Sequence, residues 1–86
     1  MYSVIWKTAA LDHLADLYVA VSTEDRSRLS GGVESFNRQL EQDPSSIGES
    51  RTGGLRIAFL PLLVVTFQVN ETTRVVRVLA VTRYGH

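Results

Sequence analysis

Residues 55–82 read LRIAFLPLLVVTFQVNETTRVVRVLAVT, and this stretch decides the fold class. Apolar and polar side chains alternate with a period of two on both sides of Pro61, which predicts two strands joined by a turn. The polar residues 70–73 form the next turn, and the valine-rich stretch 75–82 predicts a last strand. The C-terminal half of the chain is therefore expected to form antiparallel strands.

The same alternation assigns side chains to the two faces of the sheet. We expect a helix-covered face that holds Leu55, Ile57, Phe59, Leu63, Val65, Phe67, Val69, Val76, Val78 and Ala80. The open face then carries Arg56, Thr66, Gln68, Arg77 and Arg83, with Leu79 and Val81 between the last two arginines. The sequence thus predicts three arginines on one open sheet face.

Residues 2–6 precede this stretch and are rich in β-branched and aromatic side chains, so they predict a short strand. Apolar residues then recur at helical spacing over 9–21, after Thr8 as a cap, and again over 22–42, where Ser22 resembles the start of a capping box. The two apolar stripes comprise Leu11, Leu14, Tyr18 and Val21, and then Leu29, Val33, Phe36 and Leu40. Two helices joined by so few residues are expected to pack as an antiparallel hairpin.

Two breakers interrupt the second helical pattern. Gly31-Gly32 lies inside it and predicts either a bend or a close helix–helix approach, whereas Asp43-Pro44 ends it. Residues 44–54 are rich in Gly, Ser and Pro and read as a loop. The expected order is β-α-α-β-β-β, an α+β domain with the helical hairpin packed on one face of a mostly antiparallel four-stranded sheet.

The composition describes one compact domain over residues 1–86, with 44% hydrophobic and 21% charged residues. The chain has no cysteine, which excludes disulfides and thiolate metal sites. The longest uncharged run, 57–70, is 14 residues long, shorter than the ~20 apolar residues of a membrane helix. The N-terminus lacks a leader pattern, so we expect a soluble, cytoplasmic protein without membrane association.

Charge is divided between the two halves of the chain. Residues 1–49 carry four basic and eight acidic side chains, whereas residues 50–86 carry five arginines and one glutamate. This asymmetry favours a localised cationic surface built from the C-terminal part. Metal-binding, phosphate-loop and serine-hydrolase motifs are all missing from the sequence, so we expect no metal and no cofactor.

Five segments together resemble the RelE/ParE superfamily of small bacterial toxins. They read VIWKTAALDHLADLY (4–18), RQLEQDP (38–44), GLRIAF (54–59), LLVVTFQV (62–69) and RVVRVLAVTRYG (74–85). The resemblance implies the toxin of a type II toxin–antitoxin system, a protein that arrests growth and is bound by a cognate antitoxin encoded beside it, in a hetero-oligomer. Members similar to RelE cleave mRNA in the ribosome, and members similar to ParE poison DNA gyrase, so the fold alone leaves the activity open.

The resemblance also nominates site residues. Ribonuclease members carry an arginine on the strand after the hairpin turn, and this chain has Leu63 and Val64 there. Arg56, Arg77 and Arg83 match arginines on the neighbouring strands. The ending TRYGH resembles that of one ribonuclease branch, with Tyr84 matched and His86 displaced by one residue, and Glu49 resembles the carboxylate base of that branch.

Metal-independent RNA cleavage requires a base, a cation for the charged transition state and an acid. On this hypothesis Arg56, Arg77 and Arg83 bind phosphate, Tyr84 stacks on a base or donates a proton, and His86 is an acid or base. His13 is expected to be a surface residue and Trp6 a core residue. A ribosome-dependent endoribonuclease is the leading hypothesis, and a non-enzymatic gyrase poison and an inactive antitoxin-binding relative are the alternatives.

Overall fold

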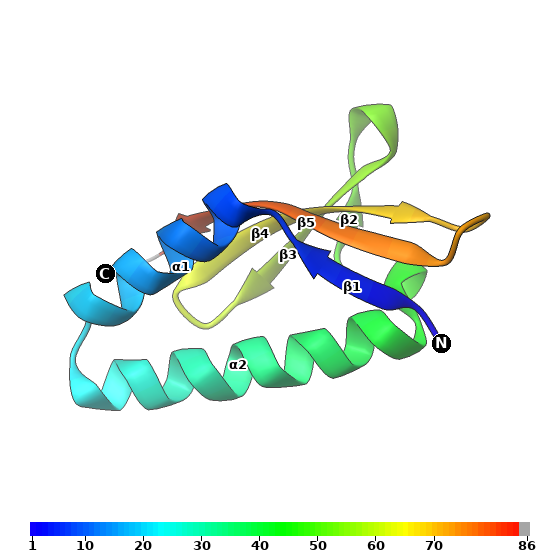
Figure 1. Ribbon diagram of the computed structural model, residues 1–86. Coiled ribbons are helices and arrows are strands. Elements are labelled where there is room, and N and C mark those ends of the chain that lie inside the picture. The colour runs from blue at the N-terminus through cyan, green and yellow to red at the C-terminus, as the bar shows by residue number, and fades with distance from the viewer. Residues whose placement is uncertain (85–86) are drawn as a thin grey trace.

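The computed structural model describes residues 1–84 and has an α+β architecture, with two helices packed on one face of a five-stranded sheet (Figure 1). The helices are α1 (Thr8–Ala20) and α2 (Thr23–Gln42), and short 3-10 turns cover Pro44–Ser46 and Thr52–Gly54. The strands are β1 (Ser3–Trp6), β2 (Glu49–Ser50), β3 (Leu55–Leu60), β4 (Leu63–Asn70) and β5 (Val75–Arg83). The predicted fold class is confirmed, and the predicted elements occur in the expected order with β2 added between α2 and β3.

The sheet has the strand order β1-β5-β4-β3-β2. β1 runs parallel to β5, and all other neighbouring pairs are antiparallel. The prediction of four strands was wrong, because Glu49–Ser50 pairs with Arg56–Ile57 inside the segment expected to be a loop. After this two-residue strand the chain projects from the sheet on the side opposite α2 (Figure 1).

The helices begin and end close to the predicted residues. The Ser22 hydroxyl accepts a hydrogen bond from the Asp25 backbone N–H at 3.2 Å, which confirms the predicted cap of α2. Thr8 is the first residue of α1 and not its cap, and Lys7 precedes it without a side-chain cap. The Arg26 side chain donates to the carbonyl oxygens of Tyr18 and Val21, so it binds the C-terminal end of α1.

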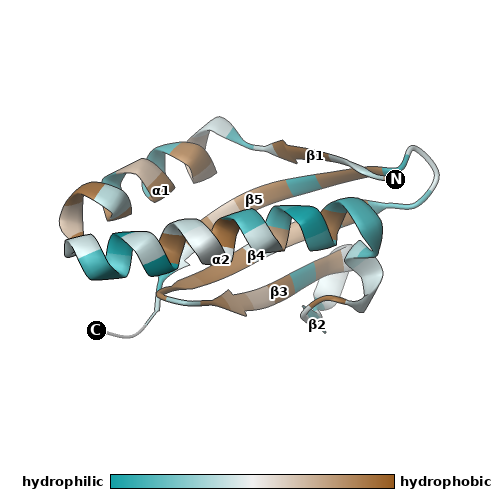
Figure 2. Cartoon of the chain, turned by 90° about the horizontal axis from the view of Figure 1, so that it is seen from below, coloured by the Kyte–Doolittle hydropathy of each residue, from teal (hydrophilic) through white to brown (hydrophobic). Residues whose placement is uncertain are grey.

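Both helices cover the same face of the sheet, as seen in Figure 2 from the helix side. The predicted stripe of α2 is confirmed, since Leu29, Phe36 and Leu40 are buried, and the rings of Phe36 and Phe67 meet edge to face at 5.6 Å. α2 continues without a break through Gly31-Gly32. The predicted bend or helix–helix approach was wrong, and Gly32 lies close to the β3–β4 turn instead, because a Cβ there would lie 2.9 Å from the Pro61 ring.

The face assignment of β3 was wrong. Ala58 and Leu60 are buried against the helices, whereas Phe59 is exposed on the open face. The two-residue turn at Pro61-Leu62 pairs Leu60 with Leu63, and directly paired residues share a face. Because Leu63 is buried, Leu60 is buried as well, and every second residue of β3 follows.

The end of β5 was also assigned to the wrong faces, because a β-bulge interrupts its pairing with β4. Thr66 pairs with Ala80 and Phe67 with Val78, which leaves Leu79 as an extra residue. The side-chain alternation therefore changes phase at Leu79: Val76 and Val78 are buried as predicted, but Val81 replaces Ala80 in the core. Within the described residues, neither helix is long and apolar enough to cross a membrane.

Candidate functional site

Arg77 lies on the open face of the sheet, as predicted. It pairs with Gln68 on β4 and with Ile5 on β1, both of which are exposed, and its own neighbours Val76 and Val78 point into the core. Within residues 1–84 the ion pairs are Arg28–Asp25, Arg38–Glu34 and Arg51–Glu49. Arg77 is therefore an exposed cation that is not neutralised by a described carboxylate.

Arg56 lies on the helix-covered face and not on the open face, because it pairs with the buried Phe67. Its Nε donates to the Ile47 carbonyl oxygen at 2.9 Å, and its Nη2 donates to the Gly48 carbonyl oxygen at 3.2 Å. These bonds join β3 to the segment that leads into β2. The guanidinium of Arg56 thus has a structural role, with two of its five N–H donors bound to backbone carbonyls of the protein.

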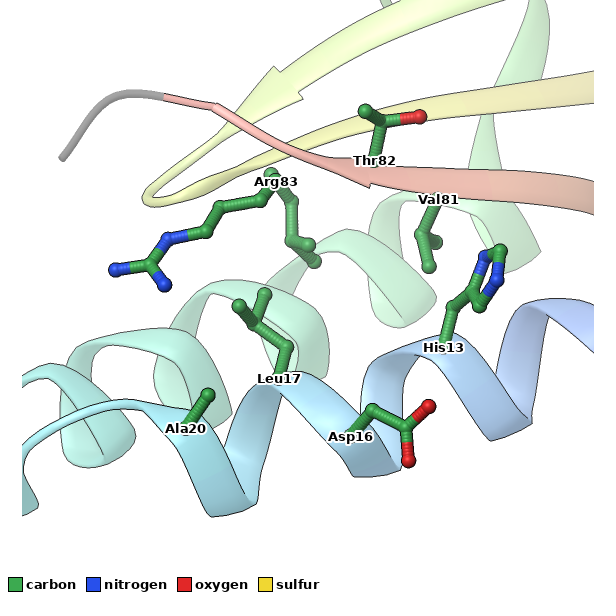
Figure 3. Close-up of a pocket in the computed structure, with 8 residues that line it drawn as sticks. His13, Asp16, Leu17, Ala20, Val81, Thr82 and Arg83 are labelled. Atoms are coloured by element: carbon green, nitrogen blue, oxygen red, sulfur yellow. The ribbon is translucent and has the colours of Figure 1, made fainter.

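Arg83 also faces the helix side, because the bulge at Leu79 changes the phase of β5 and pairs Arg83 with the buried Leu63. It lines an open groove of about 380 Å³ between α1 and the ends of β4 and β5. Figure 3 shows His13 at one end of this groove and the Arg83 guanidinium at the other, with Leu17 between them. The groove thus has an apolar floor, with His13 and Arg83 at its ends and Asp16 on its α1 side.

The three arginines therefore do not form the predicted single cradle. Arg56 and Arg83 share a face, but their partners on β4 are four residues apart, about 13 Å along the strand. Arg77 points to the opposite face of the sheet. No phosphate group can be bound by all three side chains, so the expectation of one arginine face was wrong in its geometry.

Tyr84 follows β5 and is held by a backbone hydrogen bond from its N–H to the Leu62 carbonyl oxygen at 2.8 Å. Its ring meets the ring of Phe59 edge to face at 5.2 Å, and both side chains are more than half exposed, at 54% and 57%. This aromatic pair lies at the edge of the open face. His86 lies outside the described residues.

The remaining nominated residues have ordinary surroundings. Glu49 is exposed and forms an ion pair with Arg51 at 2.9 Å, so its carboxylate already has a cation partner. Trp6 packs against the core and donates from Nε1 to Asn37 Oδ1 at 2.9 Å, as expected of a core residue. His13 is exposed as predicted, but its place in the groove that Arg83 also lines was not foreseen.

A second polar cluster joins the N-terminus to the β4–β5 turn. The hydroxyls of Ser45 and Tyr2 both donate to the Glu71 carboxylate, and these bonds lower the pKa of Glu71 below its ordinary value of 4.5. The same carboxylate raises the pKa of the Tyr2 hydroxyl, and Arg74 lies over the Tyr2 ring at 5.2 Å. The cluster comes from three separate segments of the chain, so no local sequence pattern marks it.

Residues 1–84 contain no group of three His, Cys, Asp or Glu side chains that could hold a metal ion. Arg77 and Arg83 are exposed, lie on opposite faces of the sheet and have no ion-pair partner among the described residues.

Known structures show where this architecture recurs, although no family model and no curated protein matches the chain. The chain is similar to one from the chromosomal ParDE toxin–antitoxin system of P. aeruginosa, with 22% identity, coverage of 99% and 98% of the two chains and a TM-score of 0.70. It is similar to one from the RelBE2 toxin–antitoxin complex of Mycobacterium tuberculosis, with 19% identity, coverage of 99% and 93% and a TM-score of 0.74. The isolated E. coli RelE toxin matches at 16% identity, coverage of 100% and 87% and a TM-score of 0.67.

Proposed function

We propose that this chain, which has the fold of the RelE and ParE toxins, is the toxin of a type II toxin–antitoxin system and is neutralised by a cognate antitoxin. The observation that carries the proposal is the likeness to structures of such systems, which covers 99% of this chain in both comparisons. The proposal includes both the arrest of growth by this chain and its neutralisation by the antitoxin.

The groove between α1 and β5 supports an antitoxin-binding role. Leu17, Leu63 and Val81 line it, and Arg83 lies at its end without a described ion-pair partner. An antitoxin segment with apolar side chains and a carboxylate matches this arrangement, because its apolar side chains pack on the floor of the groove and its carboxylate forms an ion pair with Arg83. Complex formation gives a toxin–antitoxin hetero-oligomer.

For the target, the geometry favours action by binding, as in ParE-like poisons of DNA gyrase. Catalytic RNA cleavage requires a cation, a base and an acid within hydrogen-bond reach of one phosphate. Arg77 and Arg83 are on opposite faces of the sheet, and the Arg56 side chain is held by hydrogen bonds to the Ile47 and Gly48 carbonyl oxygens. A protein that acts only by binding its target does not need a cation, a base and an acid close to one phosphate.

Ribosome-dependent mRNA cleavage is the second candidate. It is favoured by the exposed Arg77 and by the aromatic ring of Tyr84, which suit contacts to phosphate and to an unstacked base. Both targets lie in the bacterial cytoplasm, so we propose a cytoplasmic site of action for either one.

Two parallel assays with the purified chain distinguish the candidates. A gyrase reaction reports inhibited supercoiling or a stabilised cleavage complex, and a translation reaction followed by primer extension reports cuts in the mRNA. Gyrase inhibition with intact mRNA supports the binding mode, whereas discrete ribosome-dependent cuts support the ribonuclease. If neither reaction is affected by folded protein, both proposed targets are excluded.

A further inference from the structure

β1 forms one margin of the sheet, and its outer side has no neighbouring strand among the described residues. The Ser3 and Lys7 N–H groups both donate to carbonyl oxygens on the β5 side, at 2.9 Å. Backbone groups of successive residues in a strand point to alternate sides, so Ser3, Ile5 and Lys7 face β5. The N–H and C=O groups of Val4 and Trp6 therefore point outward.

The outward edge is short and has definite ends. At its start the Tyr2 N–H donates to the Glu41 carbonyl oxygen near the end of α2, at 2.8 Å. At its other end the chain enters α1 at Thr8. Within residues 1–84, no hydrogen bond reaches the backbone of Val4 or Trp6 from the outer side. The edge thus presents two donors and two acceptors.

This edge lacks the features that commonly protect edge strands from pairing. Its sequence, SVIW, contains no proline and no charged side chain, and its pairing with β5 runs without a bulge. The opposite margin differs, because β2 has only two residues and lies beside the exposed ion pair of Glu49 with Arg51. β1 is therefore the margin that another strand can join.

β1 is also apolar on both faces. Ile5 is 43% exposed on the open face, and Val4 and Trp6 pack against the core on the helix side while they remain partly exposed. In Figure 2, α2 runs along the middle of the sheet, and α1 begins beyond the C-terminal end of β1. An added strand would cover apolar side chains on both faces of the sheet.

We propose that the β1 edges of two copies of this chain pair antiparallel about a two-fold axis at Ile5, which joins their sheets into one sheet of ten strands. In this register Val4 of one copy faces Trp6 of the other, and the two Ile5 side chains face each other. Each facing pair of Val4 and Trp6 exchanges two hydrogen bonds, so all the outward groups of both edges are used. This dimer does not depend on the proposed toxin function, because it uses only the chain itself.

The edge matches itself in length and in chemistry. An antiparallel copy presents the same three residues in reverse order, so each outward donor meets an acceptor and Ile5 packs on Ile5. The two Arg77 side chains, which neighbour Ile5 on β5, would lie about 14 Å apart across the joined strands. That separation exceeds the screening length of about 8 Å at physiological ionic strength, so their repulsion is small.

Light scattering and sedimentation of the purified chain over a concentration series test the association. We expect a reversible dimer with a Kd of about 0.01–1 mM, because one short strand from each copy makes an interface at the small end of the range for proteins. A monomeric mass throughout a series up to about 2 mM would overturn the proposal.

Amide hydrogen exchange, followed by NMR, locates the interface. Exchange at Val4 and Trp6 should be fast in dilute protein, whereas Ile5, whose N–H faces β5, should exchange slowly at every concentration. When two-thirds of the chains are in dimers, exchange at Val4 and Trp6 should be about threefold slower, since it proceeds through the remaining monomer. A dimer in which both amides stay unprotected would overturn the pairing. Protection that appears only after addition of the product of the adjacent reading frame would assign the edge to a different partner and overturn it too.

Charged substitutions at Ile5 test the two-fold axis. Ile5→Lys and Ile5→Glu should each dimerise at least about tenfold more weakly than the wild type, because like charges replace the apolar contact on the axis. An equal mixture of the two variants should associate more tightly than either alone, since the facing charges are then opposite. Val19→Lys is the matched control, because Val19 is apolar and 82% exposed but lies on α1, and it should leave dimerisation unchanged.

Circular dichroism checks that the variants are folded, which the exposure of Ile5 leads us to expect. Wild-type dimerisation by folded Ile5→Lys would contradict pairing about Ile5. A mixture of folded variants that associates no better than its components would contradict it as well.

Discussion

Replacement of Arg56 by alanine should destabilise the fold, because its guanidinium joins β3 to the segment before β2. The bond to the Ile47 carbonyl is half-buried and the bond to the Gly48 carbonyl is exposed. Together they contribute about 1–2 kcal/mol to the free energy of unfolding, with the exposed bond at the lower end of the range. For a domain of this size, that loss lowers Tm by about 5–15 °C.

Thermal and urea unfolding, followed by circular dichroism, measure this effect. Arg77→Ala is the matched control, because Arg77 is an exposed strand arginine without a described ion pair, and its removal should change the free energy of unfolding by less than about 0.5 kcal/mol. If Arg56→Ala kept full stability and abolished growth arrest, the structural role assigned to Arg56 would be wrong and a direct role at the target would replace it.

Three further predictions concern the stability of the fold. Gly48→Ala should lower the free energy of unfolding by about 2 kcal/mol or more, because Gly48 has φ +71° and a Cβ there meets the Ile57 oxygen. Gly53→Ala is the comparison, since Gly53 has φ +76° but open space around it, and should lower the free energy of unfolding by about 1 kcal/mol. Urea unfolding measures both variants. Phe36→Ala should cost about 3–5 kcal/mol, seen as a lower urea midpoint, because it empties the core contact with Phe67. The lowered pKa of Glu71 means that its carboxylate stabilises the fold at pH values above its ordinary 4.5, and this contribution is lost as pH falls through the lowered value. The Tm difference between the wild type and Glu71→Gln should therefore shrink in acid. A Tm difference that stays constant with pH would contradict the assignment.

The helices and the order of the four longer strands along the chain could be predicted because their signals are local. Ser22 with Asp25 marks the start of α2, and the apolar spacing of Leu29, Phe36 and Leu40 marks its buried face. The faces of β3 could not be assigned by alternation alone, since residues 55–60 are apolar at positions of both parities. The two-residue turn after Leu60 held the missing information, because it fixes the pairing with Leu63.

The arginine site was mispredicted for a related reason. The bulge at Leu79 lies in the uniformly apolar run 78–81, where a change of phase leaves no mark in the sequence. That change turns Arg83 to the helix side, where it lines the same groove as His13, which comes from a distant part of the chain. The hydrogen bonds of Arg56 to backbone carbonyls are likewise invisible in the sequence, because backbone acceptors occur at every residue.

The central claim, that this chain is an antitoxin-neutralised toxin, is tested most directly by bacterial growth after induced expression. We predict arrest when the chain is expressed alone and recovery when the product of the adjacent reading frame is expressed with it. Undisturbed growth in cells that accumulate the folded chain would contradict the account, and so would an arrest that the adjacent product fails to relieve.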